Sequence, residues 1–199
     1  MANLVDSLET IKKVVFEEKI LSLEDLVRVL VEDYEGNESL RLMLLNRVPK
    51  YGNDDDLTDS MAVQVTDWVQ DEVKHYKSFL CGEIISGFFT WIMHEQLGRV
   101  TAASADGRHA GFPLSAGAGA AQGCEKQGPT AAVLSATKWQ HTSHLGGIAV
   151  NLKFNRPRND DEFEQRLLDV VTTYLLRGGF EVQVNVVDRA TLESAQESP

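Results

Sequence analysis

The pattern of the last fifty residues constrains the fold most strongly. Residues 148–154 (IAVNLKF) and 180–187 (FEVQVNVV) alternate apolar with polar side chains, which is typical of β-strands with one buried face. Between them, residues 160–177 carry apolar side chains at helical spacing, and Gly178-Gly179 provides a left-handed helix end. A strand–helix–strand order requires a crossover and favours parallel strands. The chain is therefore expected to be an α/β protein.

The polar side chains of these two strands leave two interpretations open. Gln183 and Asn185 lie on one side of the second strand, and Asn151 lies in the middle of the first. A solvated sheet face is the simpler interpretation, because alternation usually means that one face is wet. The alternative is a barrel interior or a cleft, where side-chain amides bind a ligand or a neighbouring backbone.

The first 97 residues are predicted to be mainly helical, because apolar residues recur at helical spacing. Ser22 is the expected N-cap of a second helix that ends at Gly36-Asn37, and a fourth helix is expected from residue 57 to residue 79. The expected apolar faces are Leu4, Leu8, Ile11 and Val15 in the first helix, Leu23, Leu26, Val27 and Leu30 in the second, and Met61, Val65, Trp68, Val69 and Val73 in the fourth.

Three consecutive acidic residues, Asp54, Asp55 and Asp56, precede the fourth helix. They are expected to cap it and to meet the positive end of its dipole. A metal site is the weaker interpretation, because adjacent carboxylates diverge on an extended chain and no nearby histidine completes a ligand set.

Residues 98–147 are rich in glycine and alanine and are predicted to form long loops. Residues 117–123 have GxGxxxG spacing, but no lysine follows as in a phosphate-binding P-loop, so a nucleotide site is rejected. The chain is thus expected to be one unit: a helical part (1–97), loops (98–147), and a strand–helix–strand–helix part (148–199).

Composition and charge exclude several classes of partner. The 199 residues have a formal net charge of −11, so nucleic acid and anionic membranes are not expected as partners. Cys81 and Cys124 lie far apart without CxxC spacing, which fits a reducing cytoplasm better than a disulfide framework. No apolar run is long enough to span a membrane.

Few residues suggest chemistry by their spacing alone. His141 and His144 form a local pair, which we interpret as loop residues without a metal. Neither cysteine has a base nearby in sequence that would make it a nucleophile. The apolar run of residues 88–93 is interpreted as core packing. From residue types alone the chain is an acidic, mixed α/β domain.

Several segments resemble, in order, those of the glycyl radical enzymes, the pyruvate formate-lyase-like family. They are RVPKYGNDDD (47–56), the DGR-x-AG-x-PL, GPTA and S-x-x-K elements within 98–138, GGIAVNLKF (146–154), and GGFEVQVNVVDRATLESAQESP (178–199). The match covers essentially the whole chain. It is closer to the diol dehydratase and carbon–heteroatom lyase branch than to pyruvate formate-lyase itself.

The resemblance implies a parent enzyme that cleaves a C–O, C–N, C–S or C–C bond of a small organic substrate. The family stores a radical on a backbone glycine in an RVxGY-type loop, where an S-adenosylmethionine-dependent activating enzyme installs it. The radical then acts through a cysteine in a GC-x-E context. The 199 residues contain neither motif. We therefore expect a cytoplasmic fragment that has no catalytic residue, binds no cofactor or metal, and is inactive alone.

The resemblance also implies a fold, partners and a site. The fold would be part of a ten-stranded α/β barrel with helices outside and a helical N-terminal third. The partners would be the rest of the polypeptide, the activating enzyme, a small-molecule substrate and a second copy in a homodimer. The implied substrate-facing candidates are Phe88, Phe89 and Trp91, and the barrel-interior polar candidates are Asn151, Gln183 and Asn185.

Other functions stay open from the sequence. The parent could be a formate C-acetyltransferase-type enzyme or an arylacetate decarboxylase. The chain could instead be a non-catalytic α/β binding module, or an unrelated α/β enzyme that uses Glu83, Glu95 or the histidines. Coding sequence for GC-x-E upstream and RVxGY downstream would identify the fragment of a glycyl radical enzyme.

Overall fold

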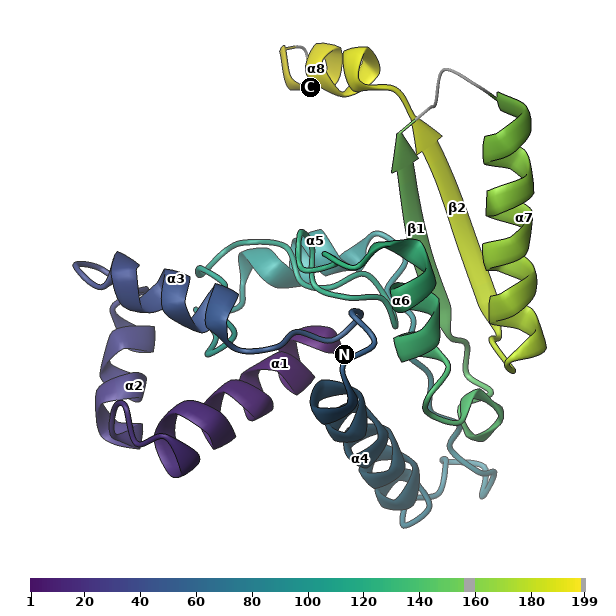
Figure 1. Cartoon of the computed structure of the whole chain (residues 1–199). Helices are drawn as coiled ribbons and strands as arrows, with labels where there is room; N and C mark the ends of the chain where they lie inside the picture. The colour runs from purple at the N-terminus through teal and green to yellow at the C-terminus, as the bar shows by residue number, and fades with distance from the viewer. Residues whose placement is uncertain (156–159, 198–199) are drawn as a thin grey trace.

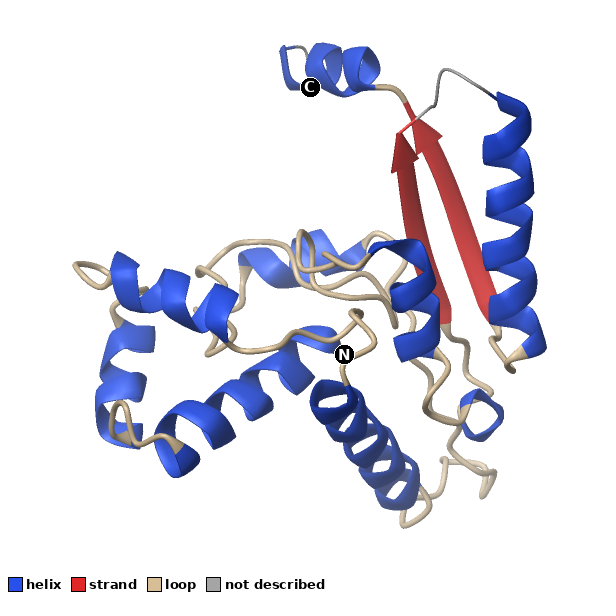
Figure 2. Ribbon diagram, in the orientation of Figure 1, coloured by secondary structure: helices blue, strands red, loops and turns tan. Residues whose placement is uncertain are grey.

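The computed structural model describes residues 1–155 and 160–197, and shows helices and long loops beside a small sheet (Figures 1 and 2). None of the helices in this described part is both long and apolar enough to cross a membrane. The elements are α1 (Ala2–Ile11), the π-helix η1 (Lys12–Glu17), α2 (Leu23–Val31), α3 (Glu38–Arg47), α4 (Asp56–Val73), α5 (Met93–Arg99), α6 (Gly128–Ala136), the 3₁₀ helix η2 (His141–Ser143), β1 (Ala149–Asn155), α7 (Asp160–Leu176), β2 (Glu181–Val187) and α8 (Arg189–Glu197).

The two strands are parallel, as the strand–helix–strand pattern predicts. β1 pairs with β2 in a register that places Ala149 opposite Glu181 and Asn155 opposite Val187. α7 is the crossover helix and lies along one face of the pair (Figure 1). Gly178, just after α7, has φ +93°, so the expected glycine helix end is confirmed. The α/β class is therefore confirmed as a small parallel sheet with helices.

Two hydrophobic cores hold the described residues together. The larger one lies where β1, α4, α6 and α7 meet, and it includes Val150, Tyr174, Trp139 and Tyr51. The smaller one lies among η1, α2 and α3 and includes Leu26 and Leu44, among others. The sheet and the α2–α3 corner are thus stabilised by separate clusters at opposite ends of the molecule (Figure 1).

The N-terminal helices form where the sequence predicts them, and two of their caps are confirmed. The Ser22 hydroxyl accepts a hydrogen bond from the Asp25 backbone N–H at 3.0 Å. The Asp55 carboxylate accepts the backbone N–H groups of Leu57 and Thr58 at 3.1 Å each. Both caps use side chains next to the helix start, so local sequence suffices to identify them.

Two predicted helix ends are wrong. α2 ends at Val31, because Asp33 and Tyr34 turn the chain with positive φ and the Tyr34 hydroxyl donates to the Ser104 carbonyl at 2.6 Å. α4 ends at Val73, and the chain then folds back so that Lys77 and Glu83 form an antiparallel bridge. In both places the helix ends earlier than its apolar periodicity predicts, because the residues that follow make contacts outside the helix.

The predicted apolar faces of α1 and α4 are only partly confirmed: Val65 is buried in the larger core and Met61 packs against it, whereas Leu4, Leu8 and Trp68 are exposed. The two helices pack together, and α1 buries Ala2, Val5 and Asp6 while Leu4 is half exposed. In α4, Trp68 is mostly exposed although it lies on the predicted face. Small and polar side chains allow the helices to approach closely, and Leu4 and Trp68 lie where no described residue covers them. The helices thus present apolar surface outward.

Candidate functional site

The polar side chains of the sheet share one face. Because side chains alternate along each strand, Asn151 of β1 and its register partner Gln183 of β2 lie on the same side, and so do Lys153 and Asn185. The opposite side carries Val182, Val184 and Val186 of β2 together with Phe154, whose ring centroid lies 5.7 Å from that of Phe163 of α7. α7 therefore covers the apolar face and leaves the amide face open.

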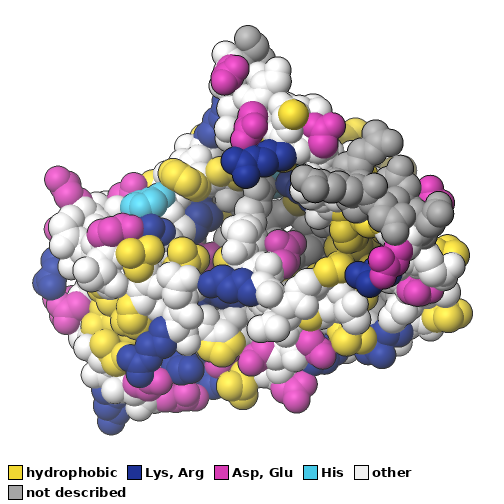
Figure 3. All heavy atoms as spheres, turned by 45° about the horizontal axis from the view of Figure 1, so that its top comes forward, with side chains coloured by type: hydrophobic (Ala, Val, Ile, Leu, Met, Phe, Trp, Pro, Cys, Tyr) yellow, Lys and Arg dark blue, Asp and Glu magenta, His cyan; other side chains and the backbone are white. Residues whose placement is uncertain are grey.

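The open face adjoins a hollow in the surface. Figure 3 shows the side that lies at the top of Figure 1, where the surface is hollowed beside α8. A cavity of about 310 Å³ lies beside β1, between its residues Asn151 and Lys153 and the glycine-rich loop. Glu125, from that loop, also lines the cavity and gives it both signs of charge. Its polar groups could bind a small polar molecule or the backbone of a further segment.

The three aromatic candidates do not lie together. Phe88 packs inward, with ring contacts to Trp139 at 5.3 Å and to His144 at 5.0 Å. Phe89 and Trp91 are exposed by 40% and 72%, and their rings contact each other at 5.7 Å. The interpretation of residues 88–93 as core packing is therefore wrong beyond Phe88. Gly87 and Phe88 are held against the residues just before β1, whereas Phe89, Trp91, Ile92 and Met93 are exposed.

Two buried histidines, His141 and His144, support this part of the core. The Phe180 backbone N–H donates to His141 Nδ1 at 3.1 Å, so Nε2 carries the proton that it donates to the Ala136 carbonyl at 2.6 Å. Burial lowers the pKa of both imidazoles. The pair is thus neutral, and it links η2 to α6 and to the start of β2.

The second of these histidines makes a contact that the sequence does not suggest. His144 Nδ1 lies 2.7 Å from the Ser86 hydroxyl, which also lies 3.0 Å from the Gln70 side-chain oxygen. A serine beside an imidazole is a potential nucleophile–base pair. Both side chains are buried, however, and neither lines the cavities described here, so the geometry favours a structural role.

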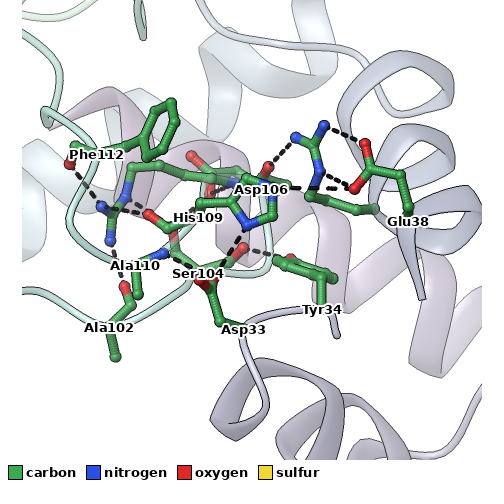
Figure 4. A network of polar contacts seen from close by, with 12 residues as sticks. Asp33, Tyr34, Glu38, Ala102, Ser104, Asp106, His109, Ala110 and Phe112 are labelled. Atoms are coloured by element: carbon green, nitrogen blue, oxygen red, sulfur yellow. Dashed lines mark hydrogen bonds and ion pairs between the residues drawn. The ribbon is translucent and has the colours of Figure 1, made fainter. Parts of the chain in front are cut away.

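The DGR segment anchors the glycine-rich loop to the N-terminal helices (Figure 4). The Asp106 carboxylate accepts a hydrogen bond from the Asn3 amide at 2.7 Å. The Arg108 guanidinium donates to the carbonyls of Ala102, His109 and Phe112. These contacts satisfy loop carbonyls, so the segment is a structural turn and charge anchor.

The acidic residues before α4 have a partner that is distant in sequence. The Lys138 ammonium lies 2.8 Å from Asp54, 3.0 Å from Asp56 and 2.8 Å from the buried carboxylate of Asp59. This ion-pair cluster ties the start of α4 to the end of α6. In residues 1–155 and 160–197, no three His, Cys, Asp or Glu side chains are placed to hold a metal ion.

The cysteines differ in environment. Cys124 is buried, and this burial raises the pKa of its thiol to about 11, so the reactive thiolate is scarce at neutral pH. Cys81 is exposed at a turn. Neither cysteine has the environment of an activated nucleophile.

Comparison with known proteins identifies the family. Residues 1–98 match the family model "Pyruvate formate lyase-like", and residues 114–199 match the model "Glycine radical". The chain belongs to the glycyl radical enzyme family. The two matched regions include the KYGNDDD segment and both strands, so the resemblance seen in the sequence is confirmed.

Similar proteins are dehydratases and lyases. The chain is 34% identical to the probable dehydratase YbiW of Escherichia coli, with all of this chain and 26% of the relative aligned. It is 34% identical to the isethionate sulfite-lyase of Desulfovibrio desulfuricans, with 100% and 24% aligned. Among solved structures, the B12-independent glycerol dehydratase of Clostridium butyricum superimposes with a TM-score of 0.91 at 33% identity, covering 100% of this chain and 25% of that one.

The chain spans about a quarter of the length of these relatives. It therefore corresponds to a fragment of a glycyl radical enzyme. The sheet, the glycine-rich loop and the N-terminal helices described above are one continuous part of that larger architecture.

Proposed function

We propose that this chain forms part of the active-site wall of a radical-based dehydratase or lyase that acts on a small organic substrate. Membership of the glycyl radical enzyme family and the similarity to proteins named as dehydratases and sulfite-lyases support this proposal. In the proposed enzyme, β1 and β2 are two strands of a ten-stranded barrel, with α6 and α7 outside it.

The observation that carries the proposal is the polarity of the two sheet faces. α7 packs on the apolar face, and the amides of Asn151, Gln183 and Asn185 lie on the face that remains open. In a barrel with α7 outside, that open face points inward. Side-chain amides both donate and accept hydrogen bonds, so they suit hydroxyl, amino or sulfonate groups of a small substrate.

The aromatic residues have different roles in this proposal. Phe89 and Trp91 are exposed and in mutual contact, so they can provide an apolar wall that excludes water from the reacting centre. Phe88 contacts Trp139 and His144 and supports the wall from behind.

The proposal includes partners that this chain does not contain. The rest of the polypeptide, a second copy in a homodimer, a small-molecule substrate and an S-adenosylmethionine-dependent activating enzyme complete it, in the cytoplasm. The glycyl radical would supply hydrogen-atom abstraction. The residues of this chain would bind and orient the substrate and keep water out, and no metal site is assigned to them.

A chimaera tests the proposal. Residues 1–199 replace the matching quarter of trans-4-hydroxy-L-proline dehydratase of Clostridioides difficile, to which the chain is 30% identical. We expect the anaerobically activated chimaera to give the glycyl doublet in electron paramagnetic resonance. Gln183→Leu in that background should lower kcat/KM at least tenfold and leave the doublet unchanged.

A matched control keeps this test specific. Glu181→Gln changes a side chain on the same sheet face, at the first residue of β2. Its kcat/KM should differ from that of the parent chimaera by less than about threefold. Equal kcat/KM for Gln183→Leu and the parent chimaera, at equal radical yield, would contradict the proposed role of the amide face.

A further inference from the structure

Three polar side chains, Gln70, Ser86 and His144, form a buried cluster behind the aromatic residues of the proposed wall. Ser86 and His144 are 9% and 1% exposed, and Gln70 reaches them from α4. The Ser86 hydroxyl lies 3.0 Å from Gln70 Oε1 and 2.7 Å from His144 Nδ1. Because an amide oxygen only accepts, the hydroxyl donates to Gln70, and a proton on His144 Nδ1 donates to the serine oxygen. This direction is the opposite of a nucleophile–base pair, in which the imidazole accepts the serine proton.

The backbone beside the buried cluster is held in one register. The Ser86 carbonyl accepts the Gly146 N–H at 2.9 Å, and the Phe88 N–H donates to the Gly147 carbonyl at 2.8 Å. Phe88 also forms a parallel bridge with Ile148. The two backbones approach so closely that a β-carbon on Gly146 would lie 2.7 Å from the Ser86 carbonyl oxygen. The segment that leads into the aromatic residues is thus fixed against the residues just before β1.

This register decides which phenylalanine reaches the amide face. Phe88 faces the core, where its ring centroid lies 5.0 Å from that of His144. Side chains alternate along an extended chain, so Phe89 faces the opposite side, which is the side of Asn151 in β1. Consistent with this, the Phe89 Cβ lies 3.8 Å from the place that a β-carbon on Gly147 would take. A slip of the segment by one residue would exchange the two phenylalanines.

We infer that the buried cluster positions the aromatic wall, Phe89 and Trp91, against the amide face and so determines how tightly the substrate binds. The inference rests on the proposed function and adds positioning residues to it. The ring centroids of the wall lie 5.7 Å apart, so the two side chains move together. A wall of this kind contacts the substrate equally in the ground state and in the transition state. Its displacement therefore raises KM and leaves kcat nearly unchanged.

The position of one proton gives a test that needs neither radical nor substrate. Nitrogen-15 NMR of the histidine-labelled 199-residue chain should find the His144 proton on Nδ1, and the His141 proton on Nε2, which donates to the Ala136 carbonyl. Ser86→Ala should shift the His144 nitrogen resonances and leave those of His141 nearly unchanged. A His144 proton on Nε2 in the parent chain would overturn the hydrogen-bond direction on which the inference rests.

Kinetics of the activated chimaera with trans-4-hydroxy-L-proline test the effect on binding. Ser86→Ala leaves two buried groups without their partner, so it should raise KM about fivefold or more and change kcat per glycyl radical less than about twofold. Gln70→Leu changes a half-buried residue of α4, should act in the same direction, and serves if Ser86→Ala does not fold. The matched control is Ser143→Ala, which removes a hydroxyl that contacts Gln140 at 3.4 Å, and its KM should stay within about twofold of the parent value.

A variant without the wall shows whether the buried cluster acts through it. Phe89→Ala/Trp91→Ala should itself raise KM, and adding Ser86→Ala should raise KM by less than about twofold further, because the positioned side chains are gone. A general effect on folding would instead add the same factor in both backgrounds. Equal factors, or an unchanged KM in Ser86→Ala and Gln70→Leu, would overturn the inference while the proposed function holds. An unchanged KM in Phe89→Ala/Trp91→Ala would overturn the wall in the proposed function as well.

Discussion

Asp6 has a buried carboxylate that makes the stability of this chain depend on pH in an unusual direction. Its Oδ1 accepts the Tyr51 backbone N–H at 2.7 Å, but its Oδ2 has no hydrogen-bond partner. Burial raises the pKa of this carboxyl from 3.8 to about 7. Nearby charges act in both directions, because Lys50 and the amino terminus favour the carboxylate whereas Asp106 opposes it.

The sign of the effect follows from the raised pKa. The folded state prefers the protonated acid, so folding is favoured while Asp6 is protonated and becomes less favourable as pH rises from about 4 to about 7. Each tenfold change in proton affinity corresponds to about 1.4 kcal/mol, so Asp6 costs about 4 kcal/mol of stability above pH 7. Other carboxylates titrate at lower pH, so only a comparison of variants isolates this group.

Asp6→Asn provides that comparison. The amide oxygen can still accept the Tyr51 N–H, and the side chain carries no charge at any pH. We expect the stability of the variant relative to the parent to increase by a few kcal/mol between pH 4 and pH 8, as measured by urea unfolding. A difference in stability that is constant across this range would refute the account of Asp6.

Three further predictions concern packing, charge and activity. Gly117→Ala should lower Tm by about 10 °C or more, because Gly117 has φ +59° and a β-carbon there would overlap the Ala149 carbonyl oxygen. The control variant Gly123→Ala changes a glycine with φ +76° whose β-carbon position is open space, so it should lower the free energy of unfolding by only about 1 kcal/mol. Thermal melting measures both variants. Lys138→Met should lower the free energy of unfolding by about 2–3 kcal/mol in urea titrations, because it leaves the buried Asp59 carboxylate without its cation. A loss below about 0.5 kcal/mol would show that the ion-pair cluster does not stabilise the fold. The 199-residue chain alone, incubated anaerobically with an activating enzyme, should show no glycyl doublet, and a doublet with turnover would contradict its assignment as an inactive fragment.

Local signals made part of the structure predictable. Ser22 and Asp55 cap helices that start beside them, so their roles follow from the adjacent sequence. The alternation in residues 180–187 and the glycines after α7 predicted the strand and the end of the crossover helix. Each of these features depends on residues within a few positions, where propensity and capping dominate.

The buried faces were not predictable in the same way. Helical periodicity shows which residues are apolar, but it does not show which neighbour exists to cover them. Leu4, Trp68 and Val27 lie on predicted apolar faces and remain exposed, because small and polar side chains make the helix contacts. These surfaces agree with a chain that corresponds to a quarter of a larger enzyme.

The candidate site was predictable in its residues but not in its geometry. Alternation in the sequence places Gln183 and Asn185 on one side of their strand, but only the register shows that Asn151 lies on the same face. The Ser86–His144 contact joins residues far apart in sequence, and no motif indicates it.

The central claim is that the amide face of the β1–β2 sheet points into an enclosed active site. A crystal structure of the chimaera with trans-4-hydroxy-L-proline bound tests it most directly. The account predicts Gln183 and Asn185 on the inner wall, with at least one side-chain amide within hydrogen-bond distance of the substrate or of a water bound to it, and α7 on the outside. A structure with these amides exposed to bulk solvent and α7 on the substrate side would contradict it.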